Sequence, residues 1–173
     1  MNRFLAVLFS ALLGSLAPAQ AQQWIEHRLP GAGYKVELPS APTIESEDVP
    51  TEFGPMPMTI AEVIVPDEMV LQTSHAILPE KAGGADANAV LKGMSDSTVE
   101  HANCKLRRES RLKVSDAPAR RIVMDCADGK VAGIGLLVFG GDRVYSALIA
   151  VPKGQEDSAN VQRFLKSFAL VPR

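Results

Sequence analysis

Four strand-like segments follow one another between residues 104 and 151, and this run constrains the fold more than any other part of the sequence. Short connections separate them, among them the turn sequences Asp128-Gly129 and Gly140-Gly141-Asp142. Strands joined by such short turns must pair antiparallel, because a parallel pair needs a long crossover connection. We therefore predict a four-strand meander. Its strands are expected at residues 104–113, 117–126, 130–139 and 143–151.

Helical spacing of apolar residues flanks this run on both sides. The first apolar stripe comprises Ala87, Val90, Leu91, Met94 and Thr98. The second comprises Val161, Phe164, Leu165 and Phe168. Each stripe leaves the other side of its helix polar, so each helix should pack on a sheet. The last two strands of the meander are apolar on both faces, and we expect them to be central and covered on both sides.

Alternating apolar and polar residues predict further strands before the first helix. These strands are expected at residues 24–29, 34–38, 43–49, 58–65 and 69–78. The predicted fold class is therefore α+β, an antiparallel β-sheet with a four-strand meander, flanked by two main α-helices. Residues 22–173 form a chain of about 150 residues, which suits one domain.

The first 21 residues have the pattern of a secretory signal peptide. Arg3 supplies a positive charge, residues 4–16 are uncharged and mostly apolar, and Ala19-Gln20-Ala21 matches a cleavage site. We predict export to the periplasm as a soluble chain from Gln22, since no later apolar stretch is long enough to span a membrane. Removing Arg3 leaves 17 basic against 20 acidic residues, and this net charge of −3 argues against a nucleic-acid partner.

Cys104 and Cys126 are the two cysteines of the chain, and an oxidising compartment favours their pairing. If the turn of the first hairpin is centred on Ser115, these cysteines face each other across two antiparallel strands. The same register pairs Leu106 with Met124, Arg108 with Ile122, Lys105 with Asp125, and Glu109 with Arg121. A slip of one residue would lose these pairs, so we predict a Cys104–Cys126 disulfide.

Two metal hypotheses are open but less favoured. His101 and Cys104, with Cys126 opposite, have a spacing that could supply three ligands to zinc or copper. Met56 and Met58 could bind Cu(I) as a pair of soft ligands. A disulfide beside an exposed histidine, and methionines used for packing, are the simpler interpretations. We expect no metal and no cofactor.

The sequence has no recognisable catalytic motif. Gly133-Ile134-Gly135 lies inside a strand, where small residues allow close packing, and not at a phosphate-binding turn. No Gly-x-Ser-x-Gly elbow occurs, and the available imidazole bases are His27, His75 and His101. A hydrolase site assembled in space stays open as an alternative, with no catalytic residue assigned.

Basic residues concentrate on the first two strands of the meander. Five of them are expected to share one strand face, namely Lys105, Arg107, Arg111, Lys113 and Arg121. Such a row is commonly a solvated face, but oriented charge also steers association. We treat these residues as a possible binding site for an envelope protein or an anionic surface.

Short motifs add a resemblance to a known family. Residues 34–42 (YKVELPSAP), 117–121 (APARR), 144–148 (VYSAL) and 163–168 (RFLKSF) resemble the PsbP-like, or DcrB-like, family of small exported bacterial domains. The resemblance implies an antiparallel sheet flanked by helices and an activity through binding and assembly, with no catalytic residue to carry over. We thus expect an exported protein with a non-catalytic binding or envelope-accessory role. The alternatives are a periplasmic hydrolase and a periplasmic metal carrier.

Overall fold

Two sheets and two α-helices make up the described chain, which covers residues 23–51, 54–80 and 84–172 of a computed structural model. The predicted signal peptide lies outside these residues. The larger sheet contains β3 (Thr43–Thr51), β4 (Gly54–Val65), β5 (Met69–Ile77), β6 (Lys105–Val114), β7 (Ala117–Cys126), β8 (Val131–Phe139) and β9 (Arg143–Pro152). The smaller contains β1 (Ile25–His27), β2 (Tyr34–Leu38) and β10 (Ala169–Leu170). The helices are α1 (Ala87–His101) and α2 (Ala159–Ser167), and a 3-10 turn, η2, spans Ala127–Gly129.

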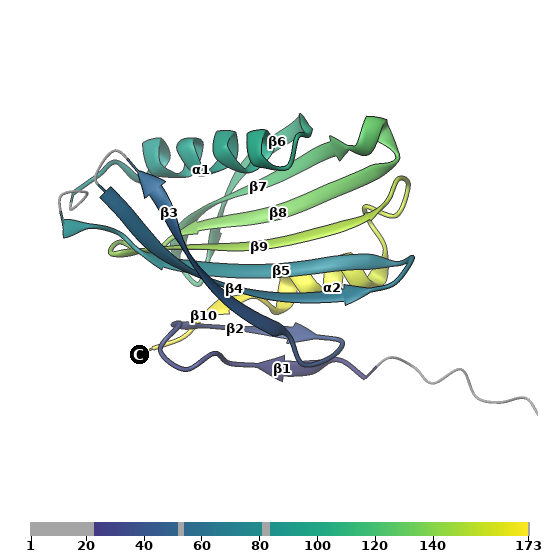
Figure 1. Cartoon of the computed structure of the whole chain (residues 1–173), viewed down its shortest axis with the longest axis horizontal. Helices are drawn as coiled ribbons and strands as arrows, with labels where there is room; N and C mark the ends of the chain where they lie inside the picture. Colours follow the sequence, from purple (N-terminus) through teal and green to yellow (C-terminus); the bar gives the residue numbers. More distant parts are fainter. Residues whose placement is uncertain (1–22, 52–53, 81–83, 173) are drawn as a thin grey trace, which may run out of the picture.

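The larger sheet has seven strands in the spatial order β3-β4-β5-β9-β8-β7-β6, and every neighbouring pair is antiparallel (Figure 1). This arrangement confirms the α+β class. The expected four-strand meander is only part of the sheet, which has seven strands. The strands β6 to β9 pair in chain order, and β5 then adds to the free edge of β9 with Ser74 opposite Ser146. That pairing joins strands far apart in the sequence, which turn chemistry cannot predict.

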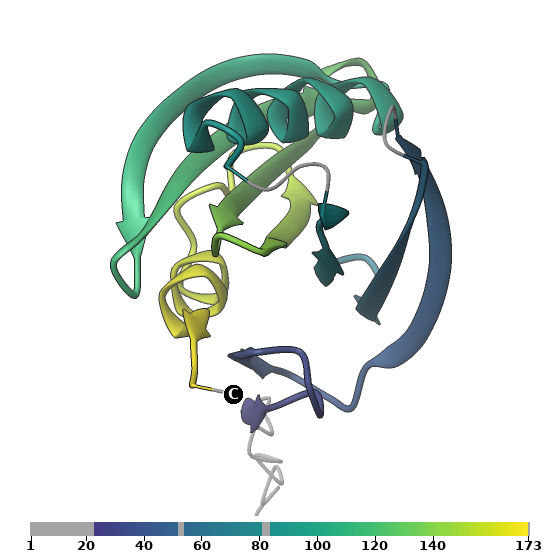
Figure 2. The same cartoon turned by 90° about the vertical axis from the view of Figure 1, so that its left-hand side faces the viewer.

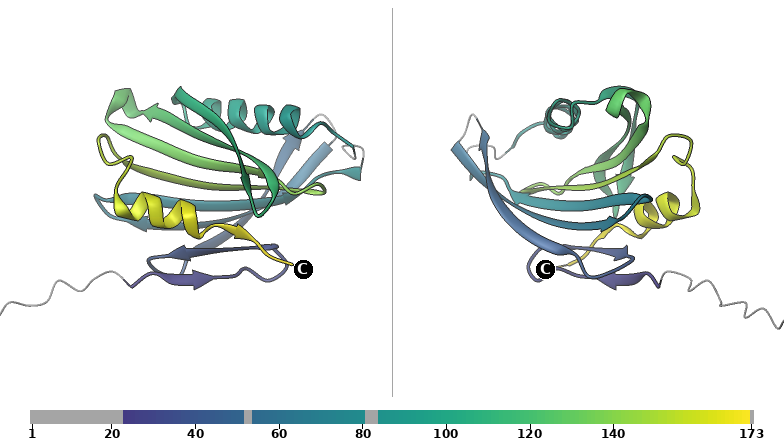
Figure 3. Two further views of the ribbon diagram at one scale, coloured as in Figure 1. Left: turned by 180° about the vertical axis from the view of Figure 1, so that it is seen from behind. Right: turned by 45° about the vertical axis from the view of Figure 1, so that its right-hand side comes forward.

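The two helices lie on opposite faces of this sheet (Figures 1 and 3). We call them the α1 face and the α2 face. On the α1 face, Leu91 of the helix packs with Ile122, Met124 and Leu137. The helix begins where the carboxylate of Asp86 accepts a hydrogen bond from the Ala89 amide at 2.9 Å, as an N-cap does.

The α2 face carries the main core, because α2 and the small sheet both cover it. Tyr34 of β2 is 1% exposed, and its hydroxyl hydrogen-bonds Thr73 Oγ1 of β5 at 2.8 Å. Its ring also stacks on Phe168, with centroids 5.1 Å apart. The hydrogen bond joins the small sheet to the large one, and the ring contact joins the small sheet to the end of α2.

The large sheet is strongly curved, as Figure 2 shows. On the α1 face the helix contacts β7 and β8, and among the described residues no helix covers β3, β4 and β5 on that face. The uncovered half of the sheet and the side of α1 therefore border a common space. Within the described residues, no helix is both long enough and apolar enough to cross a membrane.

Candidate functional site

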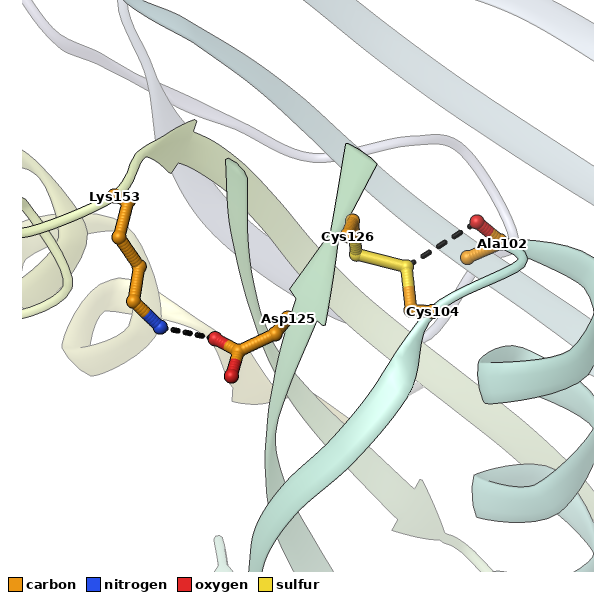
Figure 4. Close-up of a disulfide and its surroundings, with 5 residues drawn as sticks. All are labelled: Ala102, Cys104, Asp125, Cys126 and Lys153. Carbon is orange, nitrogen blue, oxygen red and sulfur yellow. Dashed lines mark hydrogen bonds and ion pairs between the residues drawn. A yellow bond between two sulfur atoms is a disulfide. The ribbon is translucent and has the colours of Figure 1, made fainter. Parts of the chain in front are cut away.

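The predicted disulfide is present between Cys104 and Cys126, with Cα atoms 4.4 Å apart (Figure 4). It ties the segment that follows α1 to the end of β7. Cys104 Sγ also lies 3.2 Å from the carbonyl oxygen of Ala102, a contact in which the oxidised sulfur has no proton to donate. Since both sulfurs are bonded to each other, neither is available as a thiolate ligand, so the hypothesis of a metal site with His101 is wrong for the oxidised protein.

The register of β6 against β7 is correct at its start and wrong beyond it. Lys105 faces Asp125 and Leu106 faces Met124 as predicted, but a bulge then shifts the pairing so that Arg108 faces Val123. The predicted pairs Arg108–Ile122 and Glu109–Arg121 do not form. The cause is the turn, which uses Ser115 and Asp116, both at positive φ (48° and 66°), and so has two residues rather than a centre on Ser115. The bulge takes up the extra residue.

This bulge separates the five basic residues that were expected to share a face. Arg111 and Lys113 pair with Arg120 and Pro118 on the α1 face, whereas Lys105 and Arg121 belong to the α2 face. The expected common face is therefore wrong, although these side chains still cluster along one edge of the sheet. Their role in partner binding stays a prediction.

Arg107, at the bulge, is already engaged by acidic neighbours. It lies 3.1 Å from Glu156 and 3.7 Å from Asp125, and Lys153 pairs with the same two carboxylates (Figure 4 shows the Lys153–Asp125 pair). Hydrogen bonding and the charge of Lys153 hold the pKa of Asp125 below its ordinary value. Arg107 is thus part of a local ion-pair network rather than a cation without partners.

A groove of about 460 Å³ opens on the α1 face, between the C-terminal half of α1 and the strands β3 and β4. Its floor is formed by β5, β9 and β8. The large apolar side chains that line it include Met58, Ile60, Leu137, Val144 and Leu148. Small residues also lie on the floor, since Ser74 and Ala76 of β5 and Ser146 of β9 line the same space. We identify this groove as the candidate functional site.

The hydroxyls of the floor satisfy each other. Ser74 Oγ and Ser146 Oγ are 2.7 Å apart, on side chains that belong to residues 8% and 7% exposed. The floor therefore presents an apolar surface with its buried polar atoms already paired, which suits an apolar occupant better than a polar one.

The rim of the groove is polar. On α1, His101 Nδ1 lies 2.9 Å from the carbonyl oxygen of Ser97 and 3.2 Å from the Ser97 hydroxyl. A carbonyl oxygen only accepts hydrogen bonds, so Nδ1 carries a proton and does not act as a base toward Ser97. Across the groove, the exposed Glu47 of β3 supplies a carboxylate. The Ser97–His101 pair is thus a helix-end contact and not a catalytic dyad.

His75, another of the three candidate histidines, lies away from the groove. It belongs to the α2 face, where its ring meets Tyr34 edge-on with centroids 5.9 Å apart. Burial, with a smaller effect of the Arg143 charge, lowers the pKa of His75, so this imidazole is neutral near pH 7. Neither His75 nor His101 forms an ion pair with a carboxylate in the part of the chain that the structure describes. In that part, no group of three or more His, Cys, Asp or Glu side chains could hold a metal ion.

The groove itself was missed by sequence reasoning. Met56 and Met58 were considered as a copper pair, and Met94 as part of a core stripe, yet all three line this one space. A signal was present in Ser74, Ala76 and Ser146, which are small residues on strands that are otherwise rich in large apolar ones. Small side chains facing one another leave volume that larger ones would fill.

Comparisons with known proteins support the fold. No family model matches the sequence, and no curated protein matches it. Among solved structures, cyanobacterial PsbP (CyanoP) from Synechocystis sp. PCC 6803 superposes with a TM-score of 0.60, covering 91% of this chain and 98% of that one. The fold is PsbP-like. The sequence identity is 9%, so the likeness concerns the fold alone.

A second solved structure is more distant. The Pseudomonas aeruginosa protein PA94, whose function is described as unknown, has 14% identity and a TM-score of 0.45. It covers 87% of this chain and 97% of its own. The PsbP-like fold that the sequence motifs implied is thus confirmed through the cyanobacterial structure.

Proposed function

We propose that this chain is an exported, soluble, non-catalytic binding protein of the periplasm, and that the groove beside α1 binds an apolar ligand. The groove carries the proposal, because it combines an apolar floor with a polar rim and a volume of about 460 Å³. Ligand pockets commonly measure about 300–1,000 Å³ and have this mixture of linings. The N-terminal sequence and the disulfide support export.

The lining indicates the chemical class of the ligand. Met56, Met58 and Met94 are flexible and polarisable, so they can adapt to an irregular apolar shape. The hydrogen bond between the Ser74 and Ser146 hydroxyls persists when water leaves the floor. A ligand with an apolar body on the floor, and a polar end beside the rim, fits this surface best.

The binding test uses Nile red, a neutral apolar dye whose fluorescence rises on leaving water. We expect the protein from Gln22 onward to bind the dye, and Ile60→Lys to weaken binding at least about tenfold, equivalent to about 1.4 kcal/mol. The lysine stem occupies the volume of the isoleucine, but its ammonium enters the apolar groove.

Ile64→Lys is the matched control. Ile64 lies on the same strand and the same face as Ile60, but it is 64% exposed and lies outside the groove. This variant should bind the dye as the unchanged protein does. Absence of binding to the unchanged protein, or equal loss in both variants, would refute the groove as the site. Near-ultraviolet circular dichroism verifies that each variant keeps its tertiary packing.

We also propose that the exposed cations of β6 bind an acidic partner. Lys105, Arg111 and Lys113 are exposed, and within the described residues none forms an ion pair. This part of the proposal concerns the edge of the sheet and does not depend on the groove. The identity of the partner is taken up next.

A further inference from the structure

The two edge strands of the seven-stranded sheet carry opposite charge. β3, at one edge, contains Glu45, Glu47 and Asp48 and no basic residue. β6, at the other edge, contains one acidic and five basic residues, and of these Arg107 is held in the network with Asp125 and Glu156. The two strands have nearly equal lengths, 9 and 10 residues.

Apart from Arg107 and Glu109, the charged residues of the two edges are exposed and have no ion-pair partner in the described chain. Every residue from 43 to 48 is exposed, and the basic residues of β6 are exposed as well. Nine salt bridges are found among the described residues, and none includes the carboxylates of β3 or the side chains of Lys105, Arg108, Arg111 and Lys113. The charged side chains of the two edge strands are therefore available to form ion pairs with another surface.

The charged rows also lie on the same side of the sheet. Glu45 and Glu47 face Ile60 and Met58 across the β3–β4 pair, which places them on the α1 face. Arg111 and Lys113 lie on the α1 face too. On the α2 face both edges expose an apolar residue, Ile44 at 54% and Leu112 at 37%.

Charges on edge strands normally prevent sheets from joining edge to edge. Here, like charges oppose contacts of β3 with β3 and of β6 with β6. Contact of β3 with β6 is the one combination that opposite charges favour. We propose that β3 of one copy docks against β6 of a second copy, so that the acidic partner of the basic edge is this same protein.

The sheet topology also determines the relative direction of the two docked strands. Six antiparallel steps separate β3 from β6, so the two strands run in the same direction. A second copy in the same orientation continues the sheet, with its carboxylate row beside the basic row and Ile44 on the same side as Leu112. Such a head-to-tail contact leaves one free edge at each end, and assemblies grow with concentration unless they close into a ring.

This inference rests on the proposed acidic partner of β6, and the test separates the two. Sedimentation velocity of the protein from Gln22 onward, over a range of concentrations, should show assemblies larger than a monomer at low ionic strength. They should dissociate as salt rises, because the Debye length falls to about 10 Å at 0.1 M.

Charge reversal tests the pairing of the edges. Glu45→Lys with Glu47→Lys makes the α1-face rows of both edges basic. Arg111→Glu with Lys113→Glu makes both of these rows acidic. Each variant alone should be monomeric. An equimolar mixture should associate again, and so should the chain that carries all four reversals.

Glu68→Lys with Glu100→Lys is the matched control for the reversal of β3, because it makes the same change in net charge at exposed positions outside both edge strands. It should associate as the unchanged protein does. Monomers at every concentration in low salt, or a mixture that stays monomeric, would overturn the proposal. Binding of such a monomer to vesicles containing anionic lipid, lost in Arg111→Glu with Lys113→Glu, would assign the basic edge to a membrane surface instead.

Discussion

Arg120 of β7 and Glu109 of β6 form an ion pair of 2.8 Å beneath the first turn of α1, with side chains 7% and 22% exposed. The same guanidinium donates to the carbonyl oxygen of Asn88 at 3.2 Å, near the beginning of the helix. One buried cation thus links two strands and the helix that borders the groove.

Removing the carboxylate should strongly destabilise this corner. In Glu109→Gln the Arg120 charge stays buried without its counter-ion, and we expect the free energy of unfolding to fall by about 3 kcal/mol. Urea denaturation measures the change. Asp96→Asn breaks the exposed Lys92–Asp96 pair of α1 and should cost no more than about 0.5 kcal/mol. Equal losses of stability in the two variants would contradict the expectation that the buried ion pair contributes more than the exposed one.

The Glu109–Arg120 pair also predicts that the free energy of unfolding depends on pH. Partial burial raises the pKa of Glu109, but its interactions with Arg120, Ser95 and Lys92 together lower it by more, so its pKa in the folded protein lies below the ordinary 4.5. The stabilising contribution is therefore complete above pH 4.5 and is lost as the pH falls through the lower, folded value. The stability difference between the unchanged protein and Glu109→Gln should shrink on acidification from neutral pH. A difference that is constant down to pH 3 would argue against this linkage.

The disulfide should stabilise the native state chiefly by restricting the unfolded chain. Cys104 and Cys126 are 22 residues apart, and a loop of that length corresponds to about 3 kcal/mol in the loop-entropy model. We expect the double substitution to serine to lower the free energy of unfolding by that amount, measured by urea denaturation without reductant. A thiol assay on the unreduced protein should detect no free cysteine, and two reactive thiols would show that the bond does not form.

Gly135 permits close packing on the α1 face. A Cβ at this position would lie 2.5 Å from Leu148 Cδ2 and 3.1 Å from Ile122 Cγ1. Gly135→Ala should therefore cost about 1–3 kcal/mol through overpacking, as measured by thermal or urea unfolding. Gly93→Ala is the control, because Gly93 is at an exposed position of α1 and no atom lies within 4 Å of the Cβ that this substitution adds. It should stabilise by up to about 1 kcal/mol, and a loss there would contradict the prediction.

The proposed export predicts a mature protein with a defined N-terminus. When the full chain is expressed in a Gram-negative host, mass spectrometry of the periplasmic fraction should find a protein that begins at Gln22. Ala19→Arg with Ala21→Arg should block cleavage and retain residues 1–21, because the cleavage site requires small residues. Cytoplasmic protein that keeps Met1 in the unchanged chain would disprove the signal peptide.

The sequence by itself determined the elements and their local pairing. Period-two alternation located the strands of the meander, helical spacing located α1 and α2, and the two cysteines specified the start of the β6–β7 register. These features follow from the stereochemistry of neighbouring residues, which the order of side chains expresses directly. The pairing of Cys104 with Cys126 needed only two adjacent strands.

Tertiary structure decided the rest. The β5–β9 pairing turned a meander into a seven-stranded sheet, because an open strand edge can accept any complementary strand and its partner is chosen by the whole core. The bulge near Arg107 moved Arg111 and Lys113 to the face opposite Lys105, a change of register set by the geometry of one turn. The groove lies between α1 and the strands that α1 leaves uncovered, and Ser74 and Ser146, 72 residues apart in the sequence, meet on its floor. Contacts between residues so far apart in the sequence are known only from the folded structure.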